Sequence, residues 1–88
     1  MLGAVHPLEN LPPDHVVCRV ALRLVSTDES LARVVTVLMR KRWSILELHH
    51  CRRADHDAVQ LTAAKPGGRP EHLVAALDRE VAVISVVQ

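Results

Sequence analysis

Apolar and polar residues alternate strictly over the stretch that follows the first prolines. Cys18, Val20 and Leu22 fall on one side of an extended chain, with arginine and alanine on the other. This period of two predicts a β-strand over residues 15–25, with one face against a hydrophobic core. Residues 1–14 hold three of the five prolines and show no period, which predicts a flexible N-terminal arm.

A helical period replaces the alternation in the next segment. Leu31, Val34 and Leu38 recur at spacings of three and four residues, so they form one apolar stripe on a helix. The helix is expected to start within residues 26–30, where hydroxyl and acidic side chains favour its N-terminus, and to end with the basic residues 40–42.

The second half of the chain predicts two more strands, a second helix and a last strand. Alternation over residues 43–52 and 58–65 predicts a β-hairpin, with 54–57 as its polar turn. The segment 66–70 (Pro-Gly-Gly-Arg-Pro) breaks the chain before a helix over 71–79, and the apolar residues 81–87 predict the final strand. In the strand 43–52, the residues expected on one face are Leu46, Leu48 and His50, and those on the other are Ile45, Glu47, His49 and Cys51.

The order strand–helix–strand–strand–helix–strand over residues 15–88 predicts a ferredoxin-like α+β domain. Such a domain has a four-stranded antiparallel sheet with two helices on one face. Domains of this kind often bind a small molecule or a larger protein, which favours a regulatory module over an enzyme. Because fold alone does not determine function, the candidate sites need separate arguments.

Composition narrows the classes of partner. The net charge is +1 and Trp43 is the single aromatic residue, so neither a basic surface nor a stacking platform for nucleic acid is expected. No apolar run approaches the roughly 20 residues of a membrane span. Two cysteines without Cys-x-x-Cys spacing, and no recognisable secretory segment, predict reduced thiols in a cytoplasmic protein.

Histidines and cysteines in the second predicted strand raise the question of metal binding or nucleophilic catalysis. His49 and Cys51 point to one side of the strand and His50 to the other, while His56 lies in the turn. We therefore favour polar residues on a partly exposed strand over a zinc site. Cys18 lies among apolar strand positions, which favours a core residue over a catalytic thiol.

Three further features have a structural and a functional interpretation. The 66–70 segment lacks the spacing of a nucleotide-binding motif, so a plain turn is favoured over an anion-binding loop. Basic residues at 40–42 and 52–53 are favoured as a solvated rim over a partner surface, and Trp43 as a buried residue over an interface anchor. The candidates for a partner interface are Arg40, Arg42, Trp43, His49 and Cys51.

The stretch Asp28–Ile45 resembles an ACT domain, most of all that of the small regulatory subunit of acetolactate synthase (acetohydroxyacid synthase). That family's first helix carries a leucine, then Arg-Val and an apolar stripe, and a basic and an aromatic residue come just before the second strand. The corresponding residues are Leu31, Arg33, Val34, Arg40, Trp43, Ser44 and Ile45.

This resemblance implies a homodimer whose sheets join edge to edge, and a catalytic large subunit as partner. The chain would have no catalytic residue and no cofactor of its own, with thiamine diphosphate on the large subunit. A small-molecule effector would lie between the loop entering the first helix and the second strand of the neighbouring copy. The residues that the resemblance assigns to this site are Asp28, Glu29, Ser30, Leu31, Ser44 and Ile45.

The sequence departs from the family at two positions of that effector site. Glu29 replaces a glycine and Ser44 replaces an asparagine that are common in amino-acid-binding members. Asp28 and Glu29 together disfavour a carboxylate ligand, because like charges repel at short range. The activating role does not depend on this pocket. The alternatives are a stand-alone ACT-type sensor of another ligand, such as an amine or cation, and a small enzyme or metal-binding protein.

Overall fold

The computed structural model describes residues 11–88 and contains the strands and helices in the predicted order. Their ends fall within two residues of the predicted bounds. The elements are β1 (His15–Leu24), α1 (Asp28–Arg40), β2 (Ser44–Arg52), β3 (Asp57–Pro66), α2 (Pro70–Asp78) and β4 (Val83–Val87). Residues 1–10 of the predicted N-terminal arm lie outside the described residues, and residues 11–14 lead into β1 through a turn in which the His15 N–H donates to the Pro12 carbonyl at 3.0 Å.

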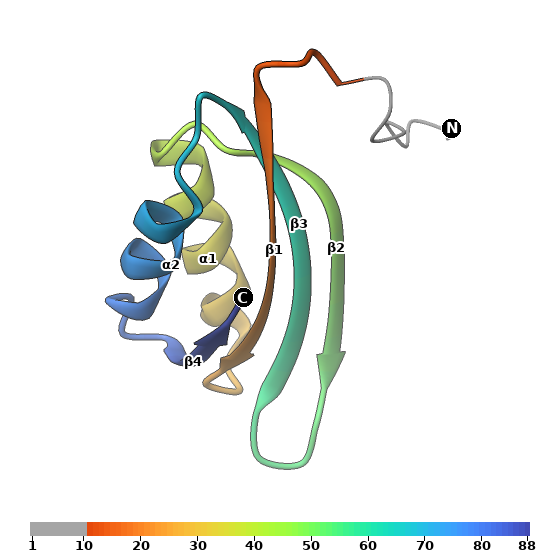
Figure 1. The fold of residues 1–88 in the computed structure, drawn as a ribbon. Helices are drawn as coiled ribbons and strands as arrows, with labels where there is room; N and C mark the ends of the chain where they lie inside the picture. Colours follow the sequence, from red (N-terminus) through yellow and green to blue (C-terminus); the bar gives the residue numbers. More distant parts are fainter. Residues whose placement is uncertain (1–10) are drawn as a thin grey trace.

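The four strands form one antiparallel sheet in the order β2-β3-β1-β4 (Figure 1). The central strands β1 and β3 pair along their whole lengths, from His15 opposite Pro66 to Leu24 opposite Asp57. β2 and β4 are the edge strands, and β4 pairs only with the last four residues of β1. This topology confirms the ferredoxin-like βαββαβ fold.

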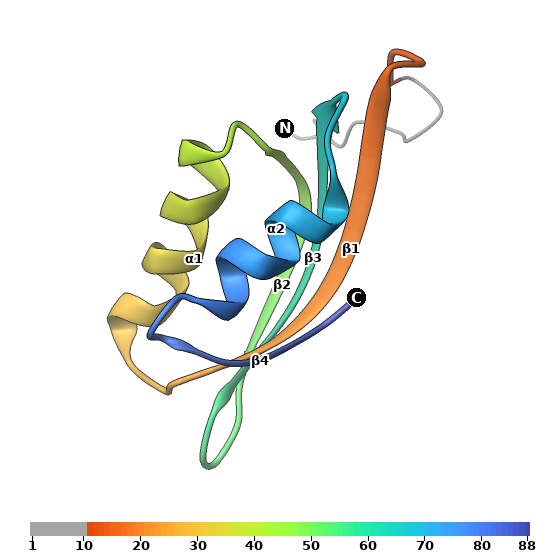
Figure 2. The ribbon, with the colours of Figure 1, turned by 60° about the vertical axis from the view of Figure 1, so that its left-hand side comes forward.

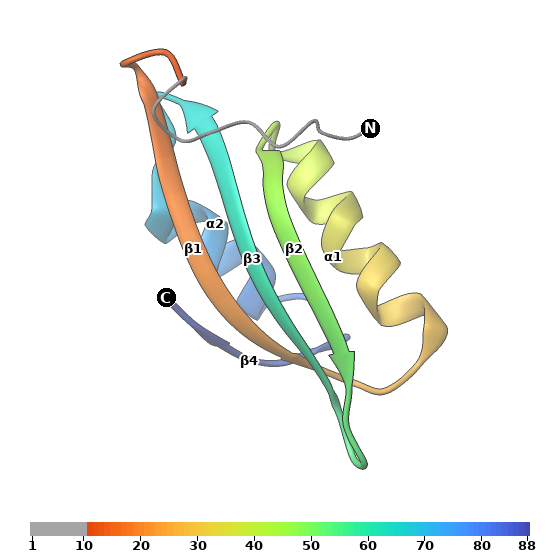
Figure 3. The ribbon, with the colours of Figure 1, turned by 90° about the vertical axis from the view of Figure 1, so that its right-hand side faces the viewer.

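Both helices cover the same face of the sheet, and no described element covers the other face (Figures 2 and 3). The apolar side of β1 lies against the helices, as its alternation predicts: Cys18, Val20, Leu22 and Leu24 are all buried. Val34 and Leu38 of α1, and Leu73 and Leu77 of α2, close this core from the other side. Within residues 11–88, neither helix is long and apolar enough to cross a membrane.

A left-handed turn after α1 directs Trp43 into the core. Arg42 has a φ of 63°, its N–H donates to the Met39 carbonyl at 3.1 Å, and the Trp43 N–H donates to the Leu38 carbonyl at 2.9 Å. These two bonds form a Schellman motif, which satisfies carbonyls at the end of the helix. Trp43 is 5% exposed, so the expectation of a buried tryptophan is confirmed.

The expected faces of β2 are wrong at its start. The register of β2 against β3 shifts between Ile45 and Glu47, which pair with Ala63 and Thr62 respectively. Because neighbouring residues of β3 point to opposite faces of the sheet, Ile45 and Glu47 do too. One extra residue, Leu46, lies in this bulge, and the simple alternation of the sequence gives no sign of it.

Candidate functional site

A buried carboxylate joins the loop that enters α1 to the β2–β3 hairpin. Asp57, the first residue of β3, is 1% exposed. Its Oδ1 accepts hydrogen bonds from Ser26 Oγ at 3.0 Å and from Arg52 Nε at 3.0 Å. Its Oδ2 accepts from Arg52 Nη2 at 3.1 Å and from His50 Nε2 at 2.8 Å. We call these four residues the Asp57 cluster.

The electrostatics of the Asp57 cluster keep the carboxylate ionised. Hydrogen bonds from Arg52 and then from His50 lower the pKa of Asp57 well below its ordinary value. The same carboxylate raises the pKa of the Arg52 guanidinium. Because all of these donors point at one carboxylate that has almost no exposed surface, the cluster fixes the loop and offers no open ligand site.

The sequence did not reveal this cluster. The sequence pattern places Asp57 in the polar turn over residues 54–57. In the structure Asp57 is the first residue of β3 and pairs with Arg52 across the hairpin. The sequence offers one signal for the cluster: Arg52 and Asp57, which flank the short β2–β3 turn, carry opposite charges. Such pairs are common on exposed hairpins, so charge alone could not indicate that this carboxylate is buried.

The residues expected to bind an effector lie in two separate groups within one chain. Asp28 and Glu29 are exposed in the first turn of α1, and Asp28 Oδ1 lies 3.6 Å from Arg52 Nη2 at the end of β2. Ser44 and Ile45 lie at the start of β2, about 25 Å away at roughly 3.3 Å per residue. A single chain therefore does not bring the two groups together.

The other two expected effector residues are less accessible. Ser30 is buried, with its hydroxyl bonded to the Val25 carbonyl and 2.9 Å from Thr27 Oγ1, and Leu31 is partly buried against the core. Both residues therefore support the start of α1, and neither presents a polar group to solvent.

The residues expected at a partner interface do not form one patch. Arg40 and Arg42 are exposed around the end of α1, whereas the indole of Trp43 is buried. His49 and Cys51 are exposed on the open face of β2, opposite Gln60 and Ala58. A partner that contacts all the exposed members would have to reach both an end of α1 and the open face of the sheet.

The histidines and cysteines are dispersed, as their positions in the sequence predict. His50 belongs to the Asp57 cluster on the helix side of the sheet, and His56 Nδ1 lies 2.7 Å from Asp55 Oδ1. Cys18 is buried, and burial raises the pKa of its thiol. Among the described residues, no group of three or more His, Cys, Asp or Glu side chains is placed to hold a metal ion.

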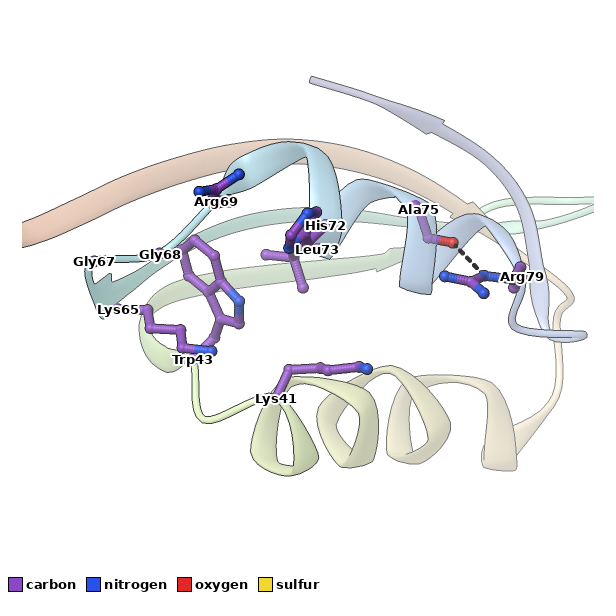
Figure 4. A pocket seen from close by; sticks show the side chains of 10 residues that line it. All are labelled: Lys41, Trp43, Lys65, Gly67, Gly68, Arg69, His72, Leu73, Ala75 and Arg79. Carbon is purple, nitrogen blue, oxygen red and sulfur yellow. Dashed lines mark hydrogen bonds between the residues drawn. The ribbon is translucent and has the colours of Figure 1, made fainter.

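A cavity of about 470 Å³ opens between the end of α1, the β3–α2 loop and α2 (Figure 4). Four lysine and arginine residues line it, together with His72, and no acidic residue does. The cations are Lys41, Lys65, Arg69 and Arg79. We call this the basic cavity. It runs along α2 from Arg69 and Trp43 at one end to Arg79 at the other, and the Asp57 cluster lies at the end of β2 away from Trp43.

Close contact between Trp43 and Gly68 forms one wall of the basic cavity. A methyl group at Gly68 would lie 2.8 Å from the indole Cη2 and 2.9 Å from the Lys65 Cβ, so only glycine fits there. The preceding Gly67 has a φ of 61°, and its N–H donates to the Asp14 carbonyl at 2.9 Å. The Pro-Gly-Gly-Arg-Pro segment is the turn that the sequence predicts, and it also supplies one cation of the cavity, Arg69.

No protein-family model and no curated protein matches the sequence. The function must therefore be argued from the residues and their geometry.

Proposed function

We propose that this chain is a non-catalytic regulatory subunit, similar to the small subunit of acetolactate synthase. It pairs with itself and activates a catalytic large subunit in the cytoplasm. The large subunit carries the thiamine diphosphate that joins two pyruvates, or pyruvate with 2-oxobutyrate, in branched-chain amino-acid synthesis. The regulatory chain contributes binding surface and acts by binding the active conformation of its partner more tightly than the inactive one.

The observation that carries this proposal is the outer edge of β2. This strand pairs with β3 on one side and with no described strand on the other. Its nine residues, Ser44–Arg52, contain no proline, and an unpaired edge of this length is a template for pairing with another chain. Pairing would also enlarge the limited core of so small a domain.

A twofold, antiparallel pairing of two β2 edges would bring the separated effector residues together. It sets the end of one β2 beside the start of the other, so that Asp28 and Glu29 of one copy approach Ser44 and Ile45 of the second. The two carboxylates disfavour an amino-acid effector there. We therefore propose activation of the large subunit without inhibition by valine.

The test is acetolactate synthase turnover by a catalytic large subunit of the same organism, with and without this chain, each titrated with valine. We expect the chain to co-elute with the large subunit and to raise its turnover, and valine to leave that turnover unchanged. An equal mass of serum albumin controls for non-specific protection of the enzyme. Unchanged turnover together with separate elution would exclude the proposal.

The basic cavity favours a second candidate, a stand-alone small-molecule sensor. The cavity is formed within one chain, so a ligand could bind there without a catalytic partner. Elution separate from the large subunit, combined with tight binding of a small anion, would favour this alternative.

A further inference from the structure

We propose that the basic cavity binds a small organic phosphate, that is, a phosphorylated metabolite or nucleotide. This site is distinct from the effector position that the resemblance implies, because it lies within one chain, between the end of α1, the β3–α2 loop and α2. It does not depend on the proposed regulatory function, and the chain alone can test it.

The distribution of charge is the first argument. The chain carries eleven basic and ten acidic residues, so a surface region of this size would be expected to hold both signs. The cavity instead gathers four of the eleven cations and no carboxylate. Among the lysines and arginines of residues 11–88, only Arg33 and Arg52 form ion pairs, so no carboxylate of that part of the chain neutralises the four cavity cations. Mutual repulsion of these cations favours a bound anion.

The origin of the cations is the second argument. Lys41 follows α1, Lys65 and Arg69 flank the glycine pair, and Arg79 follows α2 (Figure 4). Three separate segments therefore line the same cavity with positive charge, from Arg69 at the start of α2 to Arg79 at its end. A single basic helix would instead expose its charges to solvent along one face.

Rigid packing of the cavity wall is the third argument. The Gly68 N–H donates to the Lys65 carbonyl at 3.1 Å, and Gly68 is pressed against the buried indole of Trp43. On the other side, Arg79 Nε donates to the Ala75 carbonyl at 3.3 Å (Figure 4). A preformed wall lowers the entropic cost of binding, because less of the chain must be ordered.

Volume and lining indicate the class of anion. A cavity of about 470 Å³ is within the range of small-molecule sites and exceeds the needs of a bare phosphate ion. The guanidinium groups of Arg69 and Arg79 suit the bidentate geometry of phosphate oxygens. The methyl group of Ala75 and the aliphatic stems of Lys41 and Lys65 add an apolar surface, against which the organic part of the ligand can pack. A phosphate ester fits this combination better than inorganic phosphate does.

The experiment is a calorimetric titration of the full chain with ADP, inorganic phosphate and citrate at low salt, repeated at higher salt. We expect ADP to bind more tightly than inorganic phosphate or citrate, and its affinity to fall as salt rises. Arg79→Ala should weaken ADP binding by about tenfold, because a charged hydrogen-bonding partner is lost. Arg53→Ala removes the same charge from the distant β2–β3 turn and should leave binding unchanged.

A second pair of variants separates charge in the cavity from loss of fold. Ala75 is an exposed residue of α2 that lines the cavity. Ala75→Glu therefore places a carboxylate among the cations, and Ala75→Gln places a neutral side chain of the same size there. We expect Ala75→Glu to abolish ADP binding and Ala75→Gln to retain most of it, with both chains folded by circular dichroism. Equal weakening by Arg79→Ala and Arg53→Ala, equal behaviour of the two Ala75 variants, or no heat of binding with any probe would overturn the proposal. Citrate binding as tightly as ADP would overturn the phosphate class.

Discussion

The burial of Asp57 is possible only because every partner it needs is supplied by nearby chain. A buried charge without partners is strongly unfavourable, and removing one member of a buried ion pair destabilises a protein more than the pair stabilises it. Ser26 reaches Asp57 from the loop before α1, while His50 and Arg52 reach it from β2. The cluster therefore ties the loop before α1 to the end of β2, a strand that does not pair directly with β1.

The first prediction concerns the substitution Asp57→Asn. The amide keeps the size of the side chain but loses the charge, and its NH₂ group opposes the Arg52 guanidinium. We expect the melting temperature at pH 7 to fall by about 5–15 °C. Asp55→Asn is the matched control, because Asp55 is exposed in the turn just before β3 and its substitution should change the melting temperature little. A smaller effect for Asp57→Asn than for Asp55→Asn would contradict the structural role.

The second prediction is the pH dependence that follows from Asp57. Its pKa is lower in the folded chain than the value of about 3.9 expected when unfolded, so the unfolded state binds more protons in the acid range. The stabilisation is therefore complete above about pH 5 and is lost as the pH falls below about 4. Urea unfolding between pH 7 and pH 3 measures it, and Asp57→Asn should show a weaker fall than the unmodified chain.

At the scale of single elements, periodicity was enough to predict every strand and helix. Alternation in β1 and the apolar stripe of α1 reflect burial on one side, and that burial is visible in residue type alone. The sequence gives no sign of the bulge at Leu46, because Ile45 and Leu46 are both apolar and either could continue the alternation. The Asp57 cluster and the basic cavity were missed for a different reason. Their residues come from separate segments, and only the folded chain brings them together.

The end of α1 supplies the third prediction. Arg42 adopts a left-handed conformation that costs a residue with a Cβ atom roughly 1 kcal/mol. Arg42→Gly should therefore raise the free energy of unfolding by about 0.5–1 kcal/mol in urea denaturation. Lys41→Gly is the comparison, because Lys41 has a φ of −86° and gains nothing from glycine. Stabilisation by both substitutions, or by neither, would argue against the Schellman motif.

At the scale of the whole molecule, the two edges of the sheet differ in length and in pairing. β2 has nine residues and lies beside β3, which is paired on both sides. β4 has five residues, of which Ile84 and Val87 are exposed. The proposed dimer uses the longer edge. A dimer through β4 would leave the effector residues of β2 and of the α1 loop apart.

This difference gives the fourth prediction, which uses two isoleucines on opposite edges. Ile45 in β2 is 37% exposed and Ile84 in β4 is 54% exposed. We expect Ile45→Lys to convert the dimer into a monomer, because a charge on a strand edge opposes pairing, and Ile84→Lys to leave it a dimer. Analytical ultracentrifugation measures both. The reverse result would place the interface on β4, and a monomeric unmodified chain would remove the twofold arrangement from the proposal.

The position of Trp43 also gives the molecule a built-in optical signal. The chain has no tyrosine or phenylalanine, so its near-ultraviolet absorbance and emission come from this one indole. That indole packs against Gly68 at the wall of the basic cavity and is shielded from water. An unlabelled fluorescence titration thus observes the cavity directly, and a shift of emission to longer wavelength reports the opening of the same region during unfolding.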